Sequence, residues 1–292
     1  MIKFSCDRTS EDMTPVIRDV EIAKFAQRVL YDYRPELLSY TSYGNDPYYE
    51  PALLDPYDFV KRHLGSNIEI CDIYTENSRD FIAGAAVFNL QKVKVFDKDN
   101  LCTVDILVPP NTILLDRETV HRGYTGFESF TIMHEAGHLM LHQQVYRKEP
   151  VMGFSTKGEE PEPSEKAVLC KRSNIGRMSG GLITSEDFRE HQANTFAASM
   201  LMPPIMFIPF VQTQMKMYNR FIDDVMITRT INDGTSQYWR YLDILNRTAH
   251  RFGVSRRAAE VQMAKYGLQA YPENDKVKEA RRRLKMYSSL WR

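Results

Sequence analysis

The residues best suited to chemistry are His134, Glu135 and His138, which follow the pattern H-E-x-x-H. In a helix, residues four apart point the same way and lie about 6 Å apart along the axis. Two imidazoles in that arrangement can bind one borderline-soft metal ion such as Zn²⁺. Glu135 could then take a proton from water that the ion activates and pass it to a leaving amine. The pattern predicts a hydrolytic zinc site, and the competing interpretation is two ordinary histidines on a buried helix face.

A third ligand is required, because a catalytic zinc site has three protein ligands and one open position. Glu190 is the preferred candidate, since it begins the stretch E-H-Q-A-N-T-F-A-A on the next predicted helix. Asn194 lies four residues later and faces the same way. Its amide could hold a ligating histidine in place by a hydrogen bond. The alternative for Glu190 is an ordinary solvated helix charge.

Other residues near the motif are weaker candidates for the third ligand. His142 lies one further turn along, rotated by about 80° and displaced by about 12 Å from His134, which is too far to share one ion. We expect His142 to cap the helix or to lie in the core. Cys170, on a predicted loop, could supply a thiolate ligand or a switch. His191 could bind in place of Glu190.

Two predicted helices must bring these residues together. Residues 127–146 carry H-E-x-x-H and an apolar flank of Phe127, Phe130, Met133, Ala136, Gly137 and Met140. Gly137 lowers helix propensity by up to about 1 kcal/mol relative to alanine, which the close approach of another element would explain. Residues 186–201 form the second helix, capped by Ser185 and ended by Met202-Pro203-Pro204. Its small flank of Ala193, Phe196, Ala197 and Met200 permits close packing on the first.

The remaining pattern predicts an α+β fold. Ile68, Ile70 and Ile73 lie in a strand-like run, and short β-prone stretches follow at residues 85–88, 93–96, 104–108 and 112–115. No helical pattern separates them, so we expect a small, mainly antiparallel sheet built of meanders rather than a doubly wound sheet. Thr14-Pro15 predicts the start of an N-terminal helix. Asp55-Pro56 begins a short helix that Gly65 ends, and Ser255 begins a last one that Gly267 ends.

These motifs resemble the ImmA/IrrE family of metallo-endopeptidases. The stretch from Phe130 to His142 resembles the family's F-T-x-x-H-E-x-G-H-x-x-x-H helix, and Ile113-Leu114-Leu115-Asp116 resembles the strand before it. Residues 190–203 resemble its E-x-x-A-N-x-F-A-x-x-L-L-M-P element. Residues 252–268 resemble its closing F-x-V-S and L-G-L helices. The loop between the two metal helices is long for the family, and residues 205–239 and 271–292 carry no motif that aligns.

The resemblance implies a zincin-like metallopeptidase fold, in which the H-E-x-x-H helix lies under a small sheet whose edge strand binds an extended peptide. It implies His134, His138 and Glu190 as zinc ligands and Glu135 as the catalytic acid and base. It also implies a specific protein substrate, such as a helix-turn-helix repressor of a mobile element or stress response. We expect an N-terminal helical segment (1–65), a zincin-like core (66–204) and a helical, basic C-terminal region (205–292).

Charge and composition limit the other function classes. Lys and Arg number 38, as do Asp and Glu, so the chain does not coat nucleic acid or membrane by bulk charge. From residue 240 onward, however, 13 Lys and Arg stand against 5 Asp and Glu. The main alternative is therefore a non-proteolytic regulatory protein with a structural metal, binding DNA or a repressor through this region. A solvated helical surface would explain the charge equally, and a zinc amidohydrolase is a third option.

The expected compartment is the cytoplasm, with no membrane contact. The four cysteines are far apart and form no C-x-x-C, which fits a reducing compartment. The first residues hold no apolar core of a signal peptide. The longest apolar run, residues 200–211, contains three prolines and is shorter than the about 20 residues that span a bilayer. An acidic loop at residues 158–165, between the two metal helices, is a candidate gate.

Overall fold

The computed structural model describes residues 2–6, 8–38, 53–75, 82–121, 125–146, 168–171, 184–225 and 234–268. The chain divides into two compact units. Unit 1 comprises Met1–Leu38 and Leu53–Pro203, and unit 2 comprises Ser39–Ala52 and Pro204–Arg292. The expected boundaries at residues 65 and 204 stay predictions. All of the predicted metal ligands belong to unit 1.

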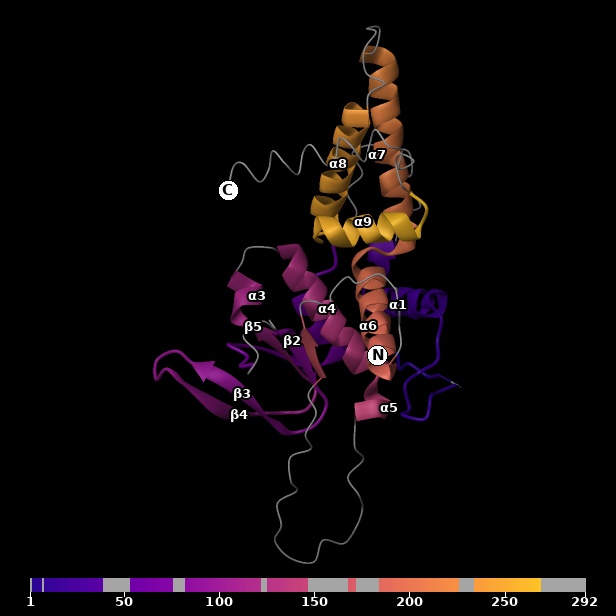
Figure 1. The fold of residues 1–292 in the computed structure, drawn as a ribbon. Coiled ribbons are helices and arrows are strands. Elements are labelled where there is room, and N and C mark those ends of the chain that lie inside the picture. The colour runs from indigo at the N-terminus through magenta and orange to yellow at the C-terminus, as the bar shows by residue number, and fades with distance from the viewer. Residues whose placement is uncertain are drawn as a thin grey trace, which may run out of the picture. The chain divides into compact units, whose positions relative to one another are not determined.

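Unit 1 contains a four-stranded sheet in the order β1-β5-β2-β6 (Figure 1). β5 (Thr112–Asp116) pairs in parallel with β1 (Asn67–Cys71) and antiparallel with β2 (Ile82–Val87). β2 pairs antiparallel with β6 (Val168–Lys171) along its other edge. Every residue of β2 and β5 is buried, which suits central strands covered on both faces. The fold is thus mixed α+β with a small sheet and several helices.

The expected meander holds for one pair of strands only. β3 (Gln91–Asp97) and β4 (Cys102–Val108) form a separate antiparallel ribbon. β3 alternates buried and exposed residues, the pattern of a strand with one solvent face. β5 has no such alternation, and it lies between β1 and β2 in the sheet instead of beside the ribbon. The prediction of a single meandering sheet, in which consecutive strands are neighbours, is therefore wrong.

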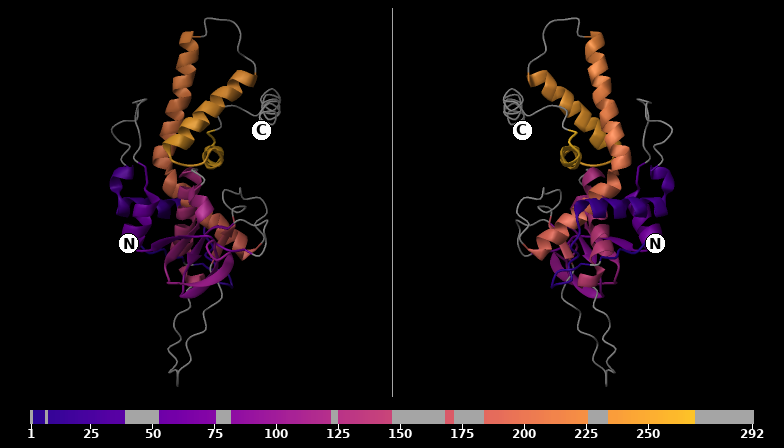
Figure 2. Two further views of the ribbon diagram at one scale, coloured as in Figure 1. Left: turned by 90° about the vertical axis from the view of Figure 1, so that its left-hand side faces the viewer. Right: turned by 90° about the vertical axis from the view of Figure 1, so that its right-hand side faces the viewer.

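Three longer helices of unit 1 pack in series beside the sheet (Figures 1 and 2). α4 (Thr125–Leu141) contacts β2 and β5 and packs along α6 (Ser185–Leu201), which in turn contacts α1 (Asp19–Tyr33). Short elements complete the unit: η1 (Pro35–Leu38), α2 (Pro56–Asp58), η2 (Phe59–Leu64), α3 (Arg117–His121) and α5 (Gln143–Tyr146). Gly65 ends η2 with φ 66°, as its position in the sequence predicts.

The packing of α4 on α6 explains the helical glycine. A Cβ atom at Gly137 would lie 3.2 Å from Ala193 Cα and 3.3 Å from Ala193 O. It would also lie 3.2 Å from Phe196 Cδ1. The backbones of α4 and α6 therefore come close together at Gly137, next to His138. The close approach that the sequence suggested is confirmed.

Replacing Gly137 with valine should force α4 and α6 apart and lower the free energy of unfolding by about 1–3 kcal/mol, as overpacking does in other cores. Chemical denaturation measures this difference. Ser129→Val, at a half-buried position of the same helix, is the matched control and should change stability by about 0.5 kcal/mol or less. A Gly137→Val variant as stable as the wild type would contradict the close packing.

The N-terminal helix begins later than predicted. α1 starts at Asp19, and Pro15 forms an isolated β-bridge with Thr9 instead of opening a helix. Val16 and Val20, which are four residues apart in the sequence, are 58% and 51% exposed and do not form an apolar helix face. The buried face consists of Ile22, Phe25, Ala26, Val29 and Leu30. Tertiary contacts of residues 8–16 thus override the local Thr-Pro signal.

The ends of α6 are close to the prediction. The cap is Thr184 rather than Ser185: its hydroxyl accepts from the Asp187 amide, and the Asp187 side chain accepts from the Thr184 amide. This reciprocal pair satisfies two amides that a helix start leaves without intrahelical partners. The helix ends at Leu201, before Pro203, as predicted.

Unit 2 contains α7 (Pro204–Val225), α8 (Gly234–Arg251) and α9 (Arg256–Lys265). The Phe252 ring, between α8 and α9, lies 5.2 Å from the Phe207 ring and 5.6 Å from the Phe210 ring. The Ser255 hydroxyl caps α9 by accepting from the Ala258 amide, as predicted. No single helix of the described chain is long and apolar enough to cross a membrane; α6 and Pro204–Met217 meet that criterion only when taken together.

Candidate metal centre

The two packed helices supply every predicted site residue. α4 carries His134, Glu135 and His138, each with no exposed surface, and α6 carries Glu190, which is 8% exposed. The helical spacing places the two imidazoles one turn apart, with ring centroids separated by 4.8 Å. The structure therefore brings together the three predicted ligands, and Glu135 follows His134 in the same helix.

The three predicted ligands converge on one point. His134 Nε2 and His138 Nε2 lie 3.1 Å apart. Glu190 Oε1 lies 3.2 Å from His138 Nε2, and Glu190 Oε2 lies 3.4 Å from His134 Nε2. Tetrahedral coordination at about 2.0–2.1 Å places ligand atoms about 3.3–3.4 Å apart, so these distances fit a shared ion. This buried group could hold a metal ion.

A residue of α6, Asn194, fixes the orientation of the His134 ring. Its Nδ1 lies 3.1 Å from Asn194 Oδ1. An amide oxygen only accepts, so Nδ1 carries a proton and donates it, and the neutral ring then has its lone pair on Nε2. Asn194 thus plays the part that its spacing from Glu190 predicted.

Burial and the Glu190 carboxylate determine the charges of the site. Burial lowers the pKa of His138, and it lowers the pKa of His142 well below the usual value. Burial also lowers the pKa of His134, but the contact with Glu190 and the negative charges of Glu190 and Glu135 outweigh it and raise this pKa. Burial raises the pKa of Glu190, but the two histidines outweigh it and hold this pKa well below its usual range. An ionised carboxylate therefore faces the imidazoles.

Glu135 lies where α4 meets the sheet. A Cβ atom at Gly84, in β2, would lie 2.9 Å from Thr131 Cγ2, 3.0 Å from Leu114 O and 3.3 Å from Glu135 Cγ. Only a residue without a side chain lets β2 come this close to the helix. Gly84 thereby keeps the strand against Glu135, a role that sequence inspection missed.

His142 is not part of the ligand group, as its helical position predicted. It is fully buried, with its Nδ1 3.0 Å from His138 Nδ1 and its Nε2 2.9 Å from Gln192 Oε1. The Gln192 amide nitrogen in turn donates to the Pro15 carbonyl at 2.7 Å. Sequence reasoning missed Gln192 and Pro15, because no spacing rule links residues so far apart.

Of the two alternative ligands, His191 does not join the group, and the role of Cys170 as a ligand or switch stays a prediction. His191 Nε2 lies 2.8 Å from Asp19 Oδ1, on the side of α6 that faces α1. Cys170 lies in β6 instead of a loop, and its side chain is outside the described structure. The acidic loop at residues 158–165 also lies outside the described residues, so its predicted role as a gate stays a prediction.

Arg189 ties residues 12–14 to α6 beside the site. Its Nη1 donates to Asp12 Oδ2 at 2.8 Å and to Thr14 Oγ1 at 2.7 Å. Its guanidinium carbon lies 5.3 Å from the centroid of the Tyr146 ring. Hydrogen bonds from Ser10, Thr14 and Arg189 hold the pKa of Asp12 well below its usual range, so the pair is charged. The N-terminal segment is thus clamped next to Glu190.

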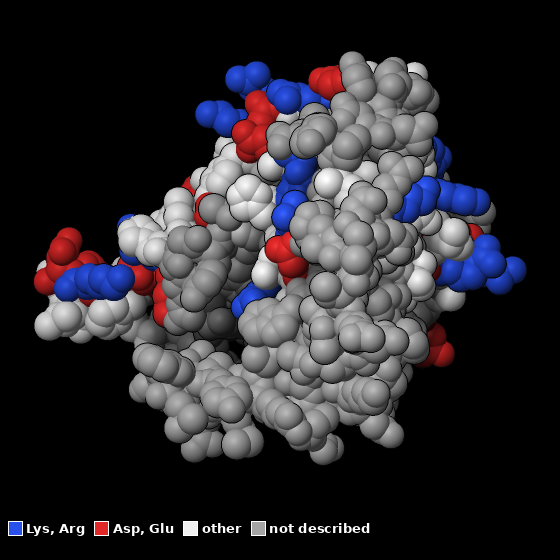
Figure 3. Space-filling view, turned by 90° about the horizontal axis from the view of Figure 1, so that it is seen from above, with Lys and Arg blue, Asp and Glu red and all other residues white. Residues whose placement is uncertain are grey.

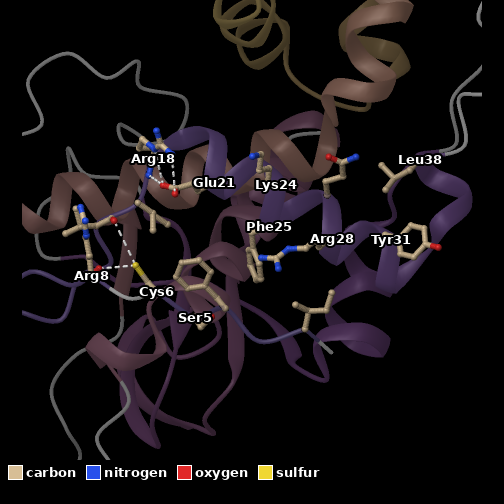
Figure 4. Close-up of a pocket in the computed structure, with 15 residues that line it drawn as sticks. Ser5, Cys6, Arg8, Arg18, Glu21, Lys24, Phe25, Arg28, Tyr31 and Leu38 are labelled. Carbon is tan, nitrogen blue, oxygen red and sulfur yellow. Dashed lines mark hydrogen bonds and ion pairs between the residues drawn. The ribbon is translucent and has the colours of Figure 1, made fainter.

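A separate pocket of about 1340 Å³ opens beside α1 (Figure 4). Among the described residues, its lining includes the cations Arg8, Arg18, Lys24 and Arg28 and one carboxylate, Glu21. Arg18 pairs with Glu21 at 3.4 Å. None of the metal-site residues lines this pocket. It is a cationic surface feature of unit 1 that is distinct from the His-His-Glu group.

The basic C-terminal region is described only as far as residue 268. Within it, Arg247 pairs with Asp243 at 2.9 Å and Arg257 pairs with Glu260 at 2.8 Å. Figure 3, a view of the whole molecule from above, shows both blue basic and red acidic side chains among the described residues. The run Arg281-Arg282-Arg283 lies outside the described residues, so DNA contact through this region stays a prediction.

Comparisons of the chain with models of protein families, with curated proteins and with solved structures found no match.

Proposed function

We propose that this protein is a zinc-dependent endopeptidase of the ImmA/IrrE type with a zincin-like fold. The observation that carries the proposal is the buried group of His134, His138 and Glu190, with ligand atoms 3.1–3.4 Å apart. Two imidazoles and one carboxylate form the ligand set of many catalytic zinc sites. The carboxylic acid next to the first histidine, Glu135, supplies the proton-transfer group that peptide hydrolysis requires.

Each residue of the site has a distinct proposed role. When bound, zinc supplies Lewis acidity that activates water and polarises a peptide carbonyl. His134 and His138 present Nε2 lone pairs, and Glu190 adds a negative charge. Glu135 takes the proton of the attacking water and delivers it to the leaving amine. Asn194 keeps the His134 ring in its binding orientation through the 3.1 Å hydrogen bond.

A specific cytoplasmic protein, such as a helix-turn-helix transcriptional repressor, is the proposed substrate. The motif resemblance supports this class of substrate. β6 covers the β2 edge of the four-stranded sheet, so its edge strands are β1 and β6, and an extended substrate segment that binds as a strand would add to one of these two.

The test is a cleavage assay with the zinc-loaded chain and helix-turn-helix repressors, beginning with any that is encoded beside its gene. We expect two repressor fragments, no cleavage after zinc is removed by a chelator, and recovery when zinc is restored. Mass spectrometry of the fragments identifies the scissile bond. A repressor or DNA that binds tightly but stays uncut would favour the alternative of a non-proteolytic regulatory protein.

A further inference from the structure

A chain of hydrogen bonds leads from the metal centre to the N-terminal segment. It runs from His138 Nδ1 to His142 Nδ1 (3.0 Å), and from His142 Nε2 to Gln192 Oε1 (2.9 Å). It ends with Gln192 Nε2 and the Pro15 carbonyl at 2.7 Å. His138 and His142 are fully buried, and Gln192 is 3% exposed. Water therefore has little access to replace any of these bonds.

The chemistry of the last bond determines the direction of all the others. A carbonyl oxygen only accepts, so the Gln192 NH₂ group must face Pro15, and the Gln192 oxygen must face His142. That oxygen requires a proton on His142 Nε2. A neutral His142 then has a bare Nδ1, which accepts the proton carried by His138 Nδ1. His138 is left with a lone pair on Nε2, the atom that faces Glu190 at 3.2 Å.

We propose that Gln192, anchored by the Pro15 carbonyl, is a positioning residue that acts through His142 to hold His138 in its metal-binding tautomer. The proposal rests on the proposed function only in taking His138 as a metal ligand. Residues 8–16 become part of the metal centre, since their own contacts fix the Pro15 carbonyl. The Val16 amide donates to Arg8 O at 2.9 Å, and Thr14 is held by Arg189.

Two substitutions of Gln192 distinguish its hydrogen bond to His142 from its hydrogen bond to the Pro15 carbonyl. Gln192→Leu removes both the acceptor for His142 and the donor to Pro15. Gln192→Glu keeps an acceptor for His142 but removes the donor to Pro15. Zinc dissociation constants, measured by competition with a chromophoric chelator, should rise about 10–100-fold for Gln192→Leu. They should stay within about threefold of the wild type for Gln192→Glu.

Hydrogen exchange of the Val16 amide should respond to the two Gln192 variants differently from zinc affinity. The Val16 amide should exchange faster in both Gln192→Leu and Gln192→Glu, because both lose the bond to Pro15. A purely structural role for Gln192 predicts that zinc affinity and Val16 exchange change together. Gln192→Leu protein that folds, by circular dichroism, and binds zinc as tightly as the wild type would overturn the proposal.

The wild-type protein provides a test that does not depend on folding of a variant. Long-range ¹H–¹⁵N correlation spectra should show His142 protonated at Nε2 and bare at Nδ1, with and without zinc. A proton on His142 Nδ1 would overturn the proposal. If the wild type binds no zinc, the proposed function fails, whereas the His142 tautomer still decides whether Gln192 directs the chain of hydrogen bonds.

Discussion

Glu135→Gln protein should keep its zinc and lose about 10²–10⁴-fold in turnover, the range that a positioned general acid-base group contributes. Glutamine has nearly the shape of glutamate but cannot take up a proton from water at neutral pH. The ligands His134, His138 and Glu190 are unchanged, so the metal content should stay the same. The measurements are the rate of repressor cleavage and the zinc content of the same sample.

Glu128→Gln is the matched control on the same helix. Glu128 accepts a 2.5 Å hydrogen bond from the Tyr57 hydroxyl, and glutamine retains an oxygen that can accept it. This variant should cleave at the wild-type rate. Cleavage by Glu135→Gln at a rate near that of the wild type would show that Glu135 is not the catalytic acid and base. Full regulatory function of Glu135→Gln without cleavage would favour the non-proteolytic alternative.

Glu190→Gln is expected to weaken zinc binding by more than the about 10–100-fold that loss of an outer hydrogen bond causes. The substitution replaces the only carboxylate of the ligand group by a neutral amide of similar size. The two imidazoles then face a poor ligand and no compensating negative charge. Chelator competition measures the affinity, and cleavage should be lost in parallel at limiting zinc.

Glu186→Gln tests whether the effect is specific to position 190. Glu186 lies one turn earlier in α6 and is exposed, so the variant removes the same charge without touching the ligand group. It should bind zinc as the wild type does. Equal zinc affinities for Glu190→Gln and the wild type would exclude Glu190 as the third ligand.

The geometry of the ligand group could be predicted because it depends on helix periodicity. The spacing of His134 and His138, and that of Glu190 and Asn194, fixes which side chains share a face, whatever the rest of the fold does. Gly137 was informative for a related reason. A glycine inside a helix has a cost, and the structure shows what offsets it, a backbone contact with Ala193.

Features that depend on distant residues could not be predicted in this way. Thr14-Pro15 has the local form of a helix start, but the Pro15 carbonyl binds Gln192, and α1 begins only at Asp19. Strand order is equally non-local. The parallel pairing of β1 with β5 joins residues 67–71 to residues 112–116, and no local pattern specifies it.

For His142, one feature could be predicted from the sequence and another could not. Helical geometry was sufficient to exclude it as a ligand that shares an ion with His134. Its actual contacts are His138, one turn away, and Gln192, fifty residues along the chain on the other metal helix. The first contact follows from spacing, and the second follows only from the packing of α4 on α6.

The most direct test of the metal centre is a crystal structure of the zinc-loaded protein with diffraction data collected on both sides of the zinc absorption edge. We expect one anomalous peak about 2.0–2.2 Å from His134 Nε2, His138 Nε2 and a Glu190 carboxylate oxygen. A peak bound by other residues, or no peak at this group in protein that contains zinc, would contradict the assignment of these three ligands.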